Sequence, residues 1–198
     1  MISQIMLNHI NFIQQKIENS IEVKISLINS DILDITNQIS NCIIDCYKKG
    51  GKVLFCGNGG SSADAQHLAA ELTGRFYKDR DPLFAESLSV NTSYLTAVSN
   101  DYSYDVVFSR LVQAFGKSGD ILIGLSTSGN SKNIVEAIKM ANSLDMTTIG
   151  FTGINDSKVS ELSKFTIKVP SDDTPRIQEC HILIGHIICE IVEREFTK

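Results

Sequence analysis

His67 and Glu71 are the first pair of residues whose types and spacing could support chemistry. They are four positions apart in a stretch typical of a helix, so their side chains share one helical face. An imidazole and a carboxylate in this arrangement can occupy two positions on one zinc ion, and the same groups can move protons. An isolated pair of this kind is more often a surface or core pair without function. Whether this pair has a function therefore depends on the other residues that the fold brings close to it.

A segment rich in glycine and serine immediately precedes this pair. It reads GNGGSS, residues 57–62, and follows a short apolar run at 53–56. Glycines let a backbone approach a ligand closely, and the free N–H groups at a helix start attract anions. Ser61 and Ser62 add hydroxyl donors. The pattern fits an anion-binding turn as well as an ordinary strand-to-helix turn, and it matches neither the dinucleotide fingerprint nor the Walker loop.

A second polar segment, STSGNS at residues 126–131, follows another apolar run at 121–125. Four hydroxyl side chains in six residues form a neutral cluster of donors, which suits a phosphate monoester that must bind and leave. The alternative interpretation is an ordinary serine-rich turn that binds no ligand. Because both segments follow strands of the same orientation, they are expected at one edge of a parallel sheet, where ligands of such folds bind. Together they predict a site for a phosphorylated ligand.

Polar residues interrupt the last, otherwise apolar helix at Gln178, His181 and His186. Uncharged polar groups in such a helix need partners. Gln178 and His186 are eight positions apart, or about 12 Å along a helix, which is a long span for ligands of one metal. His181 is nearer to Gln178. Spacing alone leaves open which histidine belongs with His67, and whether the groups come from one chain or from two subunits.

Three further residues are weaker candidates. Asn100 and Asp101 fall between the second apolar run and the next strong helical pattern, close to the expected ligand edge, and a turn is the simplest interpretation. Arg75 follows the helix that carries His67. It could stabilise that helix end or contact an anion.

Two helices are expected to form the N-terminal segment, residues 1–50. Isoleucines recur there at helical spacing, at Ile10, Ile13, Ile17, Ile21, Ile32, Ile35, Ile39 and Ile43. Asn29–Asp31 should break the pattern and cap the second helix. The Lys48–Gly51 stretch should end it, with cations at the negative helix end and glycine beyond.

The remainder, residues 51–198, alternates short apolar runs with helical stretches. The runs are expected as strands, near Val53–Cys56, Leu88–Val90, Ile121–Leu125, Thr148–Phe151 and Phe165–Val169. This alternation predicts an α/β fold with a parallel sheet. Pro175–Phe196 is expected as one long helix, with proline in its first turn. Its few polar faces, and the isoleucine-rich N-terminus, suggest that helices from several subunits pack together.

Composition narrows the functional classes. The chain has 198 residues, enough for one domain with a substantial core, and a net charge of -5. Such an acidic balance argues against nucleic-acid binding. No apolar run reaches membrane-spanning length, and the N-terminus lacks a secretory signal, so a cytoplasmic protein is expected. The five cysteines are an odd number without a CxxC pair. Reduced thiols are the simplest interpretation, and Cys42 and Cys46 are expected in the core rather than on a metal.

Four segments in order resemble the bacterial sedoheptulose 7-phosphate isomerases, or phosphoheptose isomerases, which are sugar-isomerase (SIS) domain proteins. They are GNGGSSADAQHLAAEL, VSNDY, STSGNS and SDDTPRIQECHILIGH. The resemblance runs from about Lys48 to the C-terminus. It implies a three-layer, doubly wound, five-stranded parallel sheet of flavodoxin-like type. It also implies a homotetramer with active sites between subunits, and synthesis of D-glycero-D-manno-heptose 7-phosphate for lipopolysaccharide, capsule or related glycans.

The resemblance also implies roles for individual residues. A zinc ion, one per subunit, would be held by His67, Glu71, Gln178 and His186. Glu71 and His186 would be the acid/base pair of an enediol mechanism. The substrate positions that match are Asn58, Gly59, Gly60, Glu71, Asn100, Asp101, Ser126, Thr127, Ser128, Ser131 and Gln178. Ser61 and Arg75 are added as candidate donors to the sugar phosphate.

Two competing interpretations remain. The DnaA initiator-associating protein, a protein-binding regulator, shares the fold and the GNGGS loop. That branch lacks the acidic residue at Glu71 and the histidine at His186, and it has an arginine within its STSGNS equivalent. This chain keeps Glu71, Ser128 and His186, which favours the enzyme. A metal-dependent hydrolase is the weaker alternative, because hydroxyl-rich loops suit retention of phosphate better than attack on it.

Overall fold

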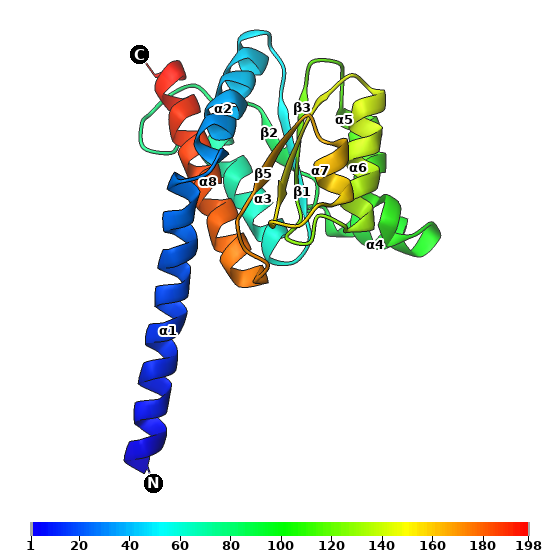
Figure 1. Ribbon diagram of the computed structural model, residues 1–198. Coiled ribbons are helices and arrows are strands. Elements are labelled where there is room, and N and C mark those ends of the chain that lie inside the picture. The colour runs from blue at the N-terminus through cyan, green and yellow to red at the C-terminus, as the bar shows by residue number, and fades with distance from the viewer. Residues whose placement is uncertain (1, 198) are drawn as a thin grey trace.

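Five short parallel strands form the centre of the computed structural model, which describes residues 2–197 and side chains from residue 9 onward (Figure 1). The strands are β1 (Val53–Gly57), β2 (Ala85–Ser87), β3 (Ile121–Leu125), β4 (Thr147–Thr152) and β5 (Phe165–Lys168). Their order is β2-β1-β3-β4-β5. The chain thus leaves β1 toward one edge of the sheet and returns to build the other, which makes β1/β3 the topological switch point.

Helices cover both faces of the sheet. The helices are α1 (Ile2–Ile28), α2 (Ile32–Lys48), α3 (Gly60–Thr73), α4 (Thr92–Asp101), the single-turn 3₁₀ helix η1 (Tyr104–Val106), α5 (Val107–Phe115), α6 (Lys132–Ser143), α7 (Lys158–Leu162) and α8 (Thr174–Phe196). Helices α2, α3 and α8 pack on one face, and α5, α6 and α7 pack on the other. This confirms the expected three-layer, doubly wound fold.

Alternation along the strands divides the core into two parts. In β1, Val53 and Phe55 join the cluster beneath α2, α3 and α8, whereas Leu54 and Cys56 join the cluster beneath α5 and α6. All five β1 residues are buried, as expected for a strand covered on both faces. Of the two cysteines expected in the core, Cys46 is buried, and Cys42 is half-buried and packs against the core.

The second strand does not lie where the apolar pattern placed it. Leu88–Val90 was expected as a strand, but β2 is Ala85–Ser87. The Leu88 N–H still donates to the Phe55 carbonyl at 2.8 Å, and its side chain is buried. Of the apolar run, only Leu88 enters the core as the chain leaves the sheet, whereas Val90 is 51% exposed. The pairing itself depends on backbone position, which hydrophobicity does not report.

The break between the first two helices lies at Asn29–Asp31, as predicted, and Ser30 supplies the side-chain hydrogen bond there. Asp31 makes no capping hydrogen bond with its side chain. Instead, the Ser30 hydroxyl accepts from the Ile32 N–H at 3.4 Å. Pro175 stands in the first turn of α8, as expected. No helix within residues 2–197 is long and apolar enough to cross a membrane.

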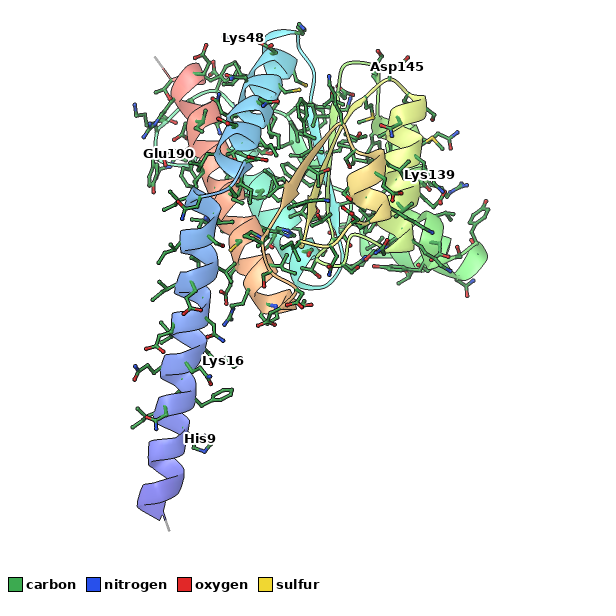
Figure 2. All side chains as sticks on the ribbon, in the orientation of Figure 1. His9, Lys16, Lys48, Lys139, Asp145 and Glu190 are labelled. Carbon is green, nitrogen blue, oxygen red and sulfur yellow. The ribbon has the colours of Figure 1, made fainter. Side chains whose placement is uncertain are left out.

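Helix α1 projects away from the rest of the fold, as Figures 1 and 2 show. Its C-terminal half is fastened to the start of α8: the Ser20 hydroxyl donates to Glu179 at 2.7 Å, and Arg176 donates to the Lys16 carbonyl at 3.0 Å. The isoleucines of α1 from Ile10 to Ile28 are largely exposed. Helix α2 differs, because Ile39 and Ile43 are fully buried against α8 and the sheet.

Gly185 determines how closely α8 approaches α3. A Cβ atom added at Gly185 would lie 2.6 Å from the terminal carbons of Leu68, so the buried Leu68 side chain would have to shift to admit it. The two helices therefore touch where one has no side chain and the other has a leucine. His186 and His67 are the immediate neighbours of these two residues. The same contact thus sets the distance between the two imidazoles.

Gly185→Ala should lower the free energy of unfolding by about 1–3 kcal/mol, because an extra methyl group overpacks this contact. Urea unfolding followed by circular dichroism measures the change. Leu68→Ala makes room for the methyl group but loses buried contacts of its own. The double variant should therefore be more stable than the sum of the single changes predicts. Strict additivity would show that Gly185 is not under this steric constraint.

Candidate active site

The loop after β1 turns tightly into α3. A Cβ at Gly57 would collide with the Ser61 carbonyl, and Gly59 has a φ of 54°, in the left-handed region. Both positions therefore require glycine for steric reasons. The result is a helix that starts at Gly60, just beyond the carboxyl end of β1 at Gly57. Anion binding at this turn stays a prediction.

The loop after β3 gathers hydroxyl groups. Ser126 Oγ lies 3.1 Å from Ser131 Oγ and 3.5 Å from Ser128 Oγ. The turn closes through the Gly129 N–H, which donates to the Ser126 carbonyl at 2.9 Å, and Gly129 has a φ of 64°. Thr127 lies in the same turn, half-buried. The four predicted side chains therefore occupy one loop, and the hydroxyls of its three serines converge at the start of α6.

A pair of amides joins the two loops. Asn58 Nδ2 donates to Asn133 Oδ1 at 2.9 Å, and Asn133 Nδ2 donates back to Asn58 Oδ1 at 2.9 Å. The Tyr104 hydroxyl also donates to Asn58 Oδ1, at 3.1 Å. Sequence reasoning missed Asn133 and Tyr104. The only available signal was an asparagine two positions beyond the serine-rich motif. The bonds hold Asn58 rigid at the switch point.

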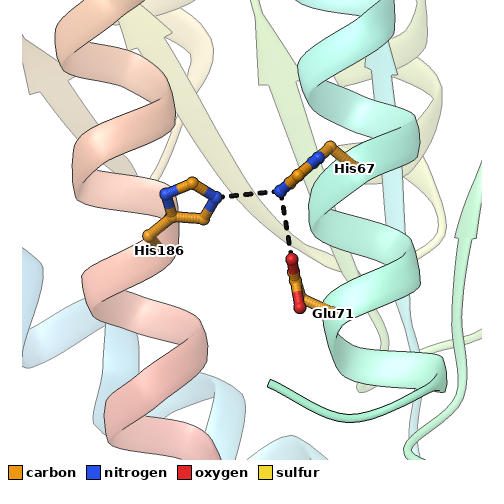
Figure 3. A group of neighbouring side chains, drawn as sticks. All are labelled: His67, Glu71 and His186. Atoms are coloured by element: carbon orange, nitrogen blue, oxygen red, sulfur yellow. Dashed lines mark hydrogen bonds and ion pairs between the residues drawn. The ribbon is translucent and has the colours of Figure 1, made fainter. Parts of the chain in front are cut away.

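His67, Glu71 and His186 converge on one point between α3 and α8 (Figure 3). His67 Nε2 is 3.0 Å from Glu71 Oε1 and 3.0 Å from His186 Nε2. One ligand atom from each residue lies within 4.8 Å of the others. The side chain of His67 is 53% exposed and that of Glu71 22% exposed, so the cluster opens to solvent on one side.

This donor set fits a zinc ion. Two imidazole nitrogens and a carboxylate oxygen are common zinc ligands, and three protein ligands leave room for another group, as catalytic sites require. The observation that supports the fit is the convergence of three donor atoms from two helices on one point. It is the only group of three or more histidine, cysteine or acidic side chains within metal-binding reach in the described part of the chain. His9 stands far away on α1, as Figure 2 shows.

Gln178 lies in the second turn of α8, beside the start of α3. Its Nε2 donates to Asp64 Oδ1 at 2.6 Å, and its side chain covers the backbone of Gly60. Asp64 is 5% exposed. Burial raises the pKa of the Asp64 carboxyl, although the bond from Gln178 and the nearby His67 and His186 rings oppose that rise. Asp64 lies within the GNGGSSADAQHLAAEL segment, but its role was not predicted.

His181, the rival candidate, faces the core instead. It is fully buried, and its Nε2 donates to the Thr152 carbonyl at 3.1 Å. Its ring packs edge-on to Phe151. Burial lowers the pKa of His181 to about 4, with a smaller opposing effect from the Thr152 carbonyl. The structure therefore brings His186, and not His181, to His67.

Glu193 fastens the chain that leaves α3. Its carboxylate accepts from the N–H groups of Phe76 and Tyr77 at 2.7 Å and from that of Lys78 at 3.0 Å. Burial raises the pKa of Glu193, but these donors and the Arg80 guanidinium outweigh it, so the pKa stays below its ordinary value. The Phe76 ring is thereby held 5.6 Å from the His186 ring.

Three predicted residues lie at the margin of the site. Asn100 and Asp101 are the last two residues of α4, so the expectation of a turn was wrong. Both are exposed, and Asn100 donates to Asp101 at 3.0 Å. The Thr96 hydroxyl donates to the Thr92 carbonyl within that helix at 2.8 Å. Arg75 is exposed just beyond α3. None of the three bonds to either loop in the described residues.

Comparisons with known proteins agree with this geometry. The family model described as "SIS domain" matches residues 17–153. A phosphoheptose isomerase from Clostridium acetobutylicum is 52% identical over 186 residues, which cover 93% of this chain and 95% of that protein. The chain belongs to the phosphoheptose isomerase family. A second relative in that family, from Aneurinibacillus thermoaerophilus, is 47% identical over 92% of this chain and 93% of its own length.

Solved structures of phosphoheptose isomerases share the fold. The structure from Neisseria gonorrhoeae superposes with a TM-score of 0.87 at 41% identity, and covers 93% of this chain and 98% of that chain. The structure from Francisella tularensis gives a TM-score of 0.90 at 36% identity, with the same coverage. These family members confirm the fold class and the resemblance that the four motifs indicated.

His181→Gln should make stability less dependent on pH. In the native protein His181 stays neutral down to about pH 4, whereas in the unfolded chain it takes up a proton near pH 6.5. Wild-type stability should therefore fall by about 2 kcal/mol through this residue as the pH drops from 7.5 to 5. Glutamine does not titrate and can still donate to Thr152. Guanidinium unfolding of both proteins at each pH, with chelator present, measures the difference. Equal pH dependence would contradict the assignment.

Proposed function

We propose that this chain is an aldose–ketose isomerase that converts sedoheptulose 7-phosphate to D-glycero-D-manno-heptose 7-phosphate, an early step toward activated heptose for lipopolysaccharide or capsule. Its family membership and the order of its motifs support this assignment. One structural observation carries the proposal: a helix that starts in the glycine- and serine-rich loop after β1 presents His67 and Glu71 to His186. Binding of the phosphorylated sugar and reaction at its carbonyl end are thus coupled through α3.

The substrate would lie across the switch point. The Ser126–Ser131 hydroxyls would hold the phosphate, since they converge at the start of α6. The remaining proposed contacts to the sugar phosphate are Asn58, Gly59, Gly60, Ser61, Arg75, Asn100, Asp101 and Gln178. Asn58 is the best supported of these because two partners already fix its amide. Fixed donors orient a substrate without an additional entropic cost at the moment of reaction.

The chemistry is a proton transfer between neighbouring carbons. One proton leaves C1 of the ketose, an enediol forms, and a proton is delivered to C2 to give the aldose. We assign the two proton-carrying roles to Glu71 and His186, which approach the same point from different helices. Zinc, which His67, Glu71, Gln178 and His186 would hold, would supply Lewis acidity that stabilises negative charge developing on the substrate oxygen.

Glu71→Gln tests this assignment. Glutamine retains the shape and a coordinating oxygen but cannot accept a proton at neutral pH. We expect a folded protein whose isomerase rate falls by a factor on the order of 10² or more. The assay follows sedoheptulose 7-phosphate by NMR in D₂O, where wild-type turnover should introduce deuterium at C2 of the product.

Glu136→Gln is the matched control, since Glu136 is a solvent-exposed carboxylate of α6 paired with Lys139. It should isomerise at the wild-type rate. A Glu71→Gln protein that also kept that rate would contradict the mechanism. A wild-type protein without isomerase activity would instead favour a protein-binding regulator on the same fold.

We also propose that the chain assembles as a homotetramer, with active sites between subunits and α1 as part of the contact. Exposed isoleucines form one stripe along α1 at spacings of three and four residues, namely Ile10, Ile13, Ile17, Ile21, Ile25 and Ile28, each at least 50% exposed. Such a continuous apolar stripe is typical of a helix that packs against others. The half-open His67 cluster is consistent with completion by a neighbouring subunit.

Ile17→Asp combined with Ile21→Asp should prevent this assembly, because burial of two carboxylates in an apolar contact is costly. Light scattering coupled to size-exclusion chromatography should find about four times the chain mass of 21.8 kDa for the wild type, and a smaller species for the variant. Gln15→Asp, on the opposite side of α1, should leave the assembly intact. A wild-type monomer would refute the tetramer.

A further inference from the structure

The amide of Gln178 is held at one end only. Its Nε2 donates to Asp64 Oδ1 at 2.6 Å. Its Oε1 makes no hydrogen bond to any residue within the described range. The two ends of an amide have nearly the same shape, so packing alone does not decide which end faces a site. An ionised carboxylate accepts hydrogen bonds but cannot donate them, and it therefore pairs with the NH₂ end alone. With Asp64 on one side, the carbonyl oxygen is the end left for a ligand.

Asp64 is an unusual group to bury in this position. It is 5% exposed, and its second oxygen, Oδ2, is buried without a hydrogen-bond partner among the described residues. A buried carboxylate with a single hydrogen bond costs stability rather than adding to it. Asp64 lies one helical turn before His67 on the same face of α3, and its surroundings include both His67 and His186. The position of Asp64 therefore indicates a role at the cluster of His67, Glu71 and His186 rather than in the packing of the core.

We propose that Asp64 is a positioning residue of the metal site, which orients Gln178 so that its carbonyl oxygen faces the point where His67, Glu71 and His186 converge. The inference deepens the proposed function and rests on it, because it assumes that Gln178 is a ligand there. The hydrogen bond has a second effect: donation of the amide N–H to a negative oxygen increases the electron density on the carbonyl oxygen, which makes it a stronger ligand.

The consequence is that Asp64 acts on the metal through Gln178 rather than directly. Asp64→Asn keeps the size of the side chain but can donate or accept, so Gln178 loses its preferred orientation. Partners of this kind typically change metal affinity by about 10–100-fold. The apoprotein should not become less stable, because the substitution removes a buried charge with an unpaired oxygen. A residue that served packing alone would show the opposite pattern, with lower stability and unchanged zinc affinity.

A double-mutant cycle on zinc affinity tests the inference. The full-length wild type, Asp64→Asn, Gln178→Ala and the double variant are stripped of metal and titrated with zinc against a chromophoric chelator. We expect Asp64→Asn to weaken zinc binding by about 10–100-fold in the wild-type background. It should have no further effect once Gln178 is alanine, because the group it orients is gone. Thermal unfolding of each apoprotein accompanies the titration, and Asp64→Ala is carried through the same cycle in case the asparagine variant misfolds.

The outcomes separate this inference from the proposed function. An unchanged zinc affinity in Asp64→Asn overturns the positioning role. An equal loss of affinity with and without Gln178 also overturns it, since Asp64 would then act through its charge alone. In both cases a wild-type protein that binds zinc and isomerises sedoheptulose 7-phosphate leaves the proposed function standing. A wild-type protein that binds no zinc overturns the metal site and the positioning role together.

Discussion

The close contact between α3 and α8 is the constraint on which the site depends. Gly185 has no side chain, and Leu68 fills the space that one would occupy. The two helices are far apart in the chain, and each contributes an imidazole beside this contact, from residues 119 positions apart. Since packed interiors resist changes of even one methyl group, the contact sets the separation of His67 and His186 within narrow limits. His67 and Glu71 are already neighbours on α3, and the contact between the helices brings His186 to them, so that three donor atoms lie within 4.8 Å of one another.

The topology of the sheet supplies the other half of the site. Strands β1 and β3 are neighbours in the sheet, but the chain after β1 continues to β2 on one side and the chain after β3 continues to β4 on the other. The loops after these two strands therefore face each other at one edge. The reciprocal Asn58–Asn133 pair then holds the two loops in register. One loop starts the helix that carries His67 and Glu71. A ligand held at the loops is thus placed at a defined distance along α3 from the groups that could act on it.

Two buried carboxylates near the His67 cluster, Glu193 and Asp64, contribute differently to stability. Glu193 receives three backbone N–H groups and Arg80, so its charge is well compensated and it stabilises the chain after α3. Asp64 receives one bond and leaves an oxygen unpaired. The contrast shows how the same functional group can contribute stability in one place and cost it in another, depending on the donors supplied by its surroundings.

Local sequence was enough to predict the elements that carry the chemistry. Helical spacing placed His67 beside Glu71, and glycine with serine after apolar runs placed both loops, because these patterns depend on neighbours within a few residues. The order of four motifs was enough to predict the family. The exact strand pairing was not, since the apolar Leu88–Val90 run lies beyond β2, and neither was the helical end of α4 at Asn100 and Asp101.

Only the tertiary structure decided between His181 and His186 on geometric grounds. Both lie on α8 within a few residues, and the resemblance alone favoured His186, but the packing of α8 turns His181 toward Thr152 and His186 toward His67. Long-range partners likewise determine the roles of three polar residues, because the hydrogen bonds of Asp64, Asn133 and Glu193 join them to residues more than 70 positions away in the chain. The sequence by itself determined which groups were present and which local faces they shared. The partners of those groups were decided by long-range packing, which no local pattern encodes.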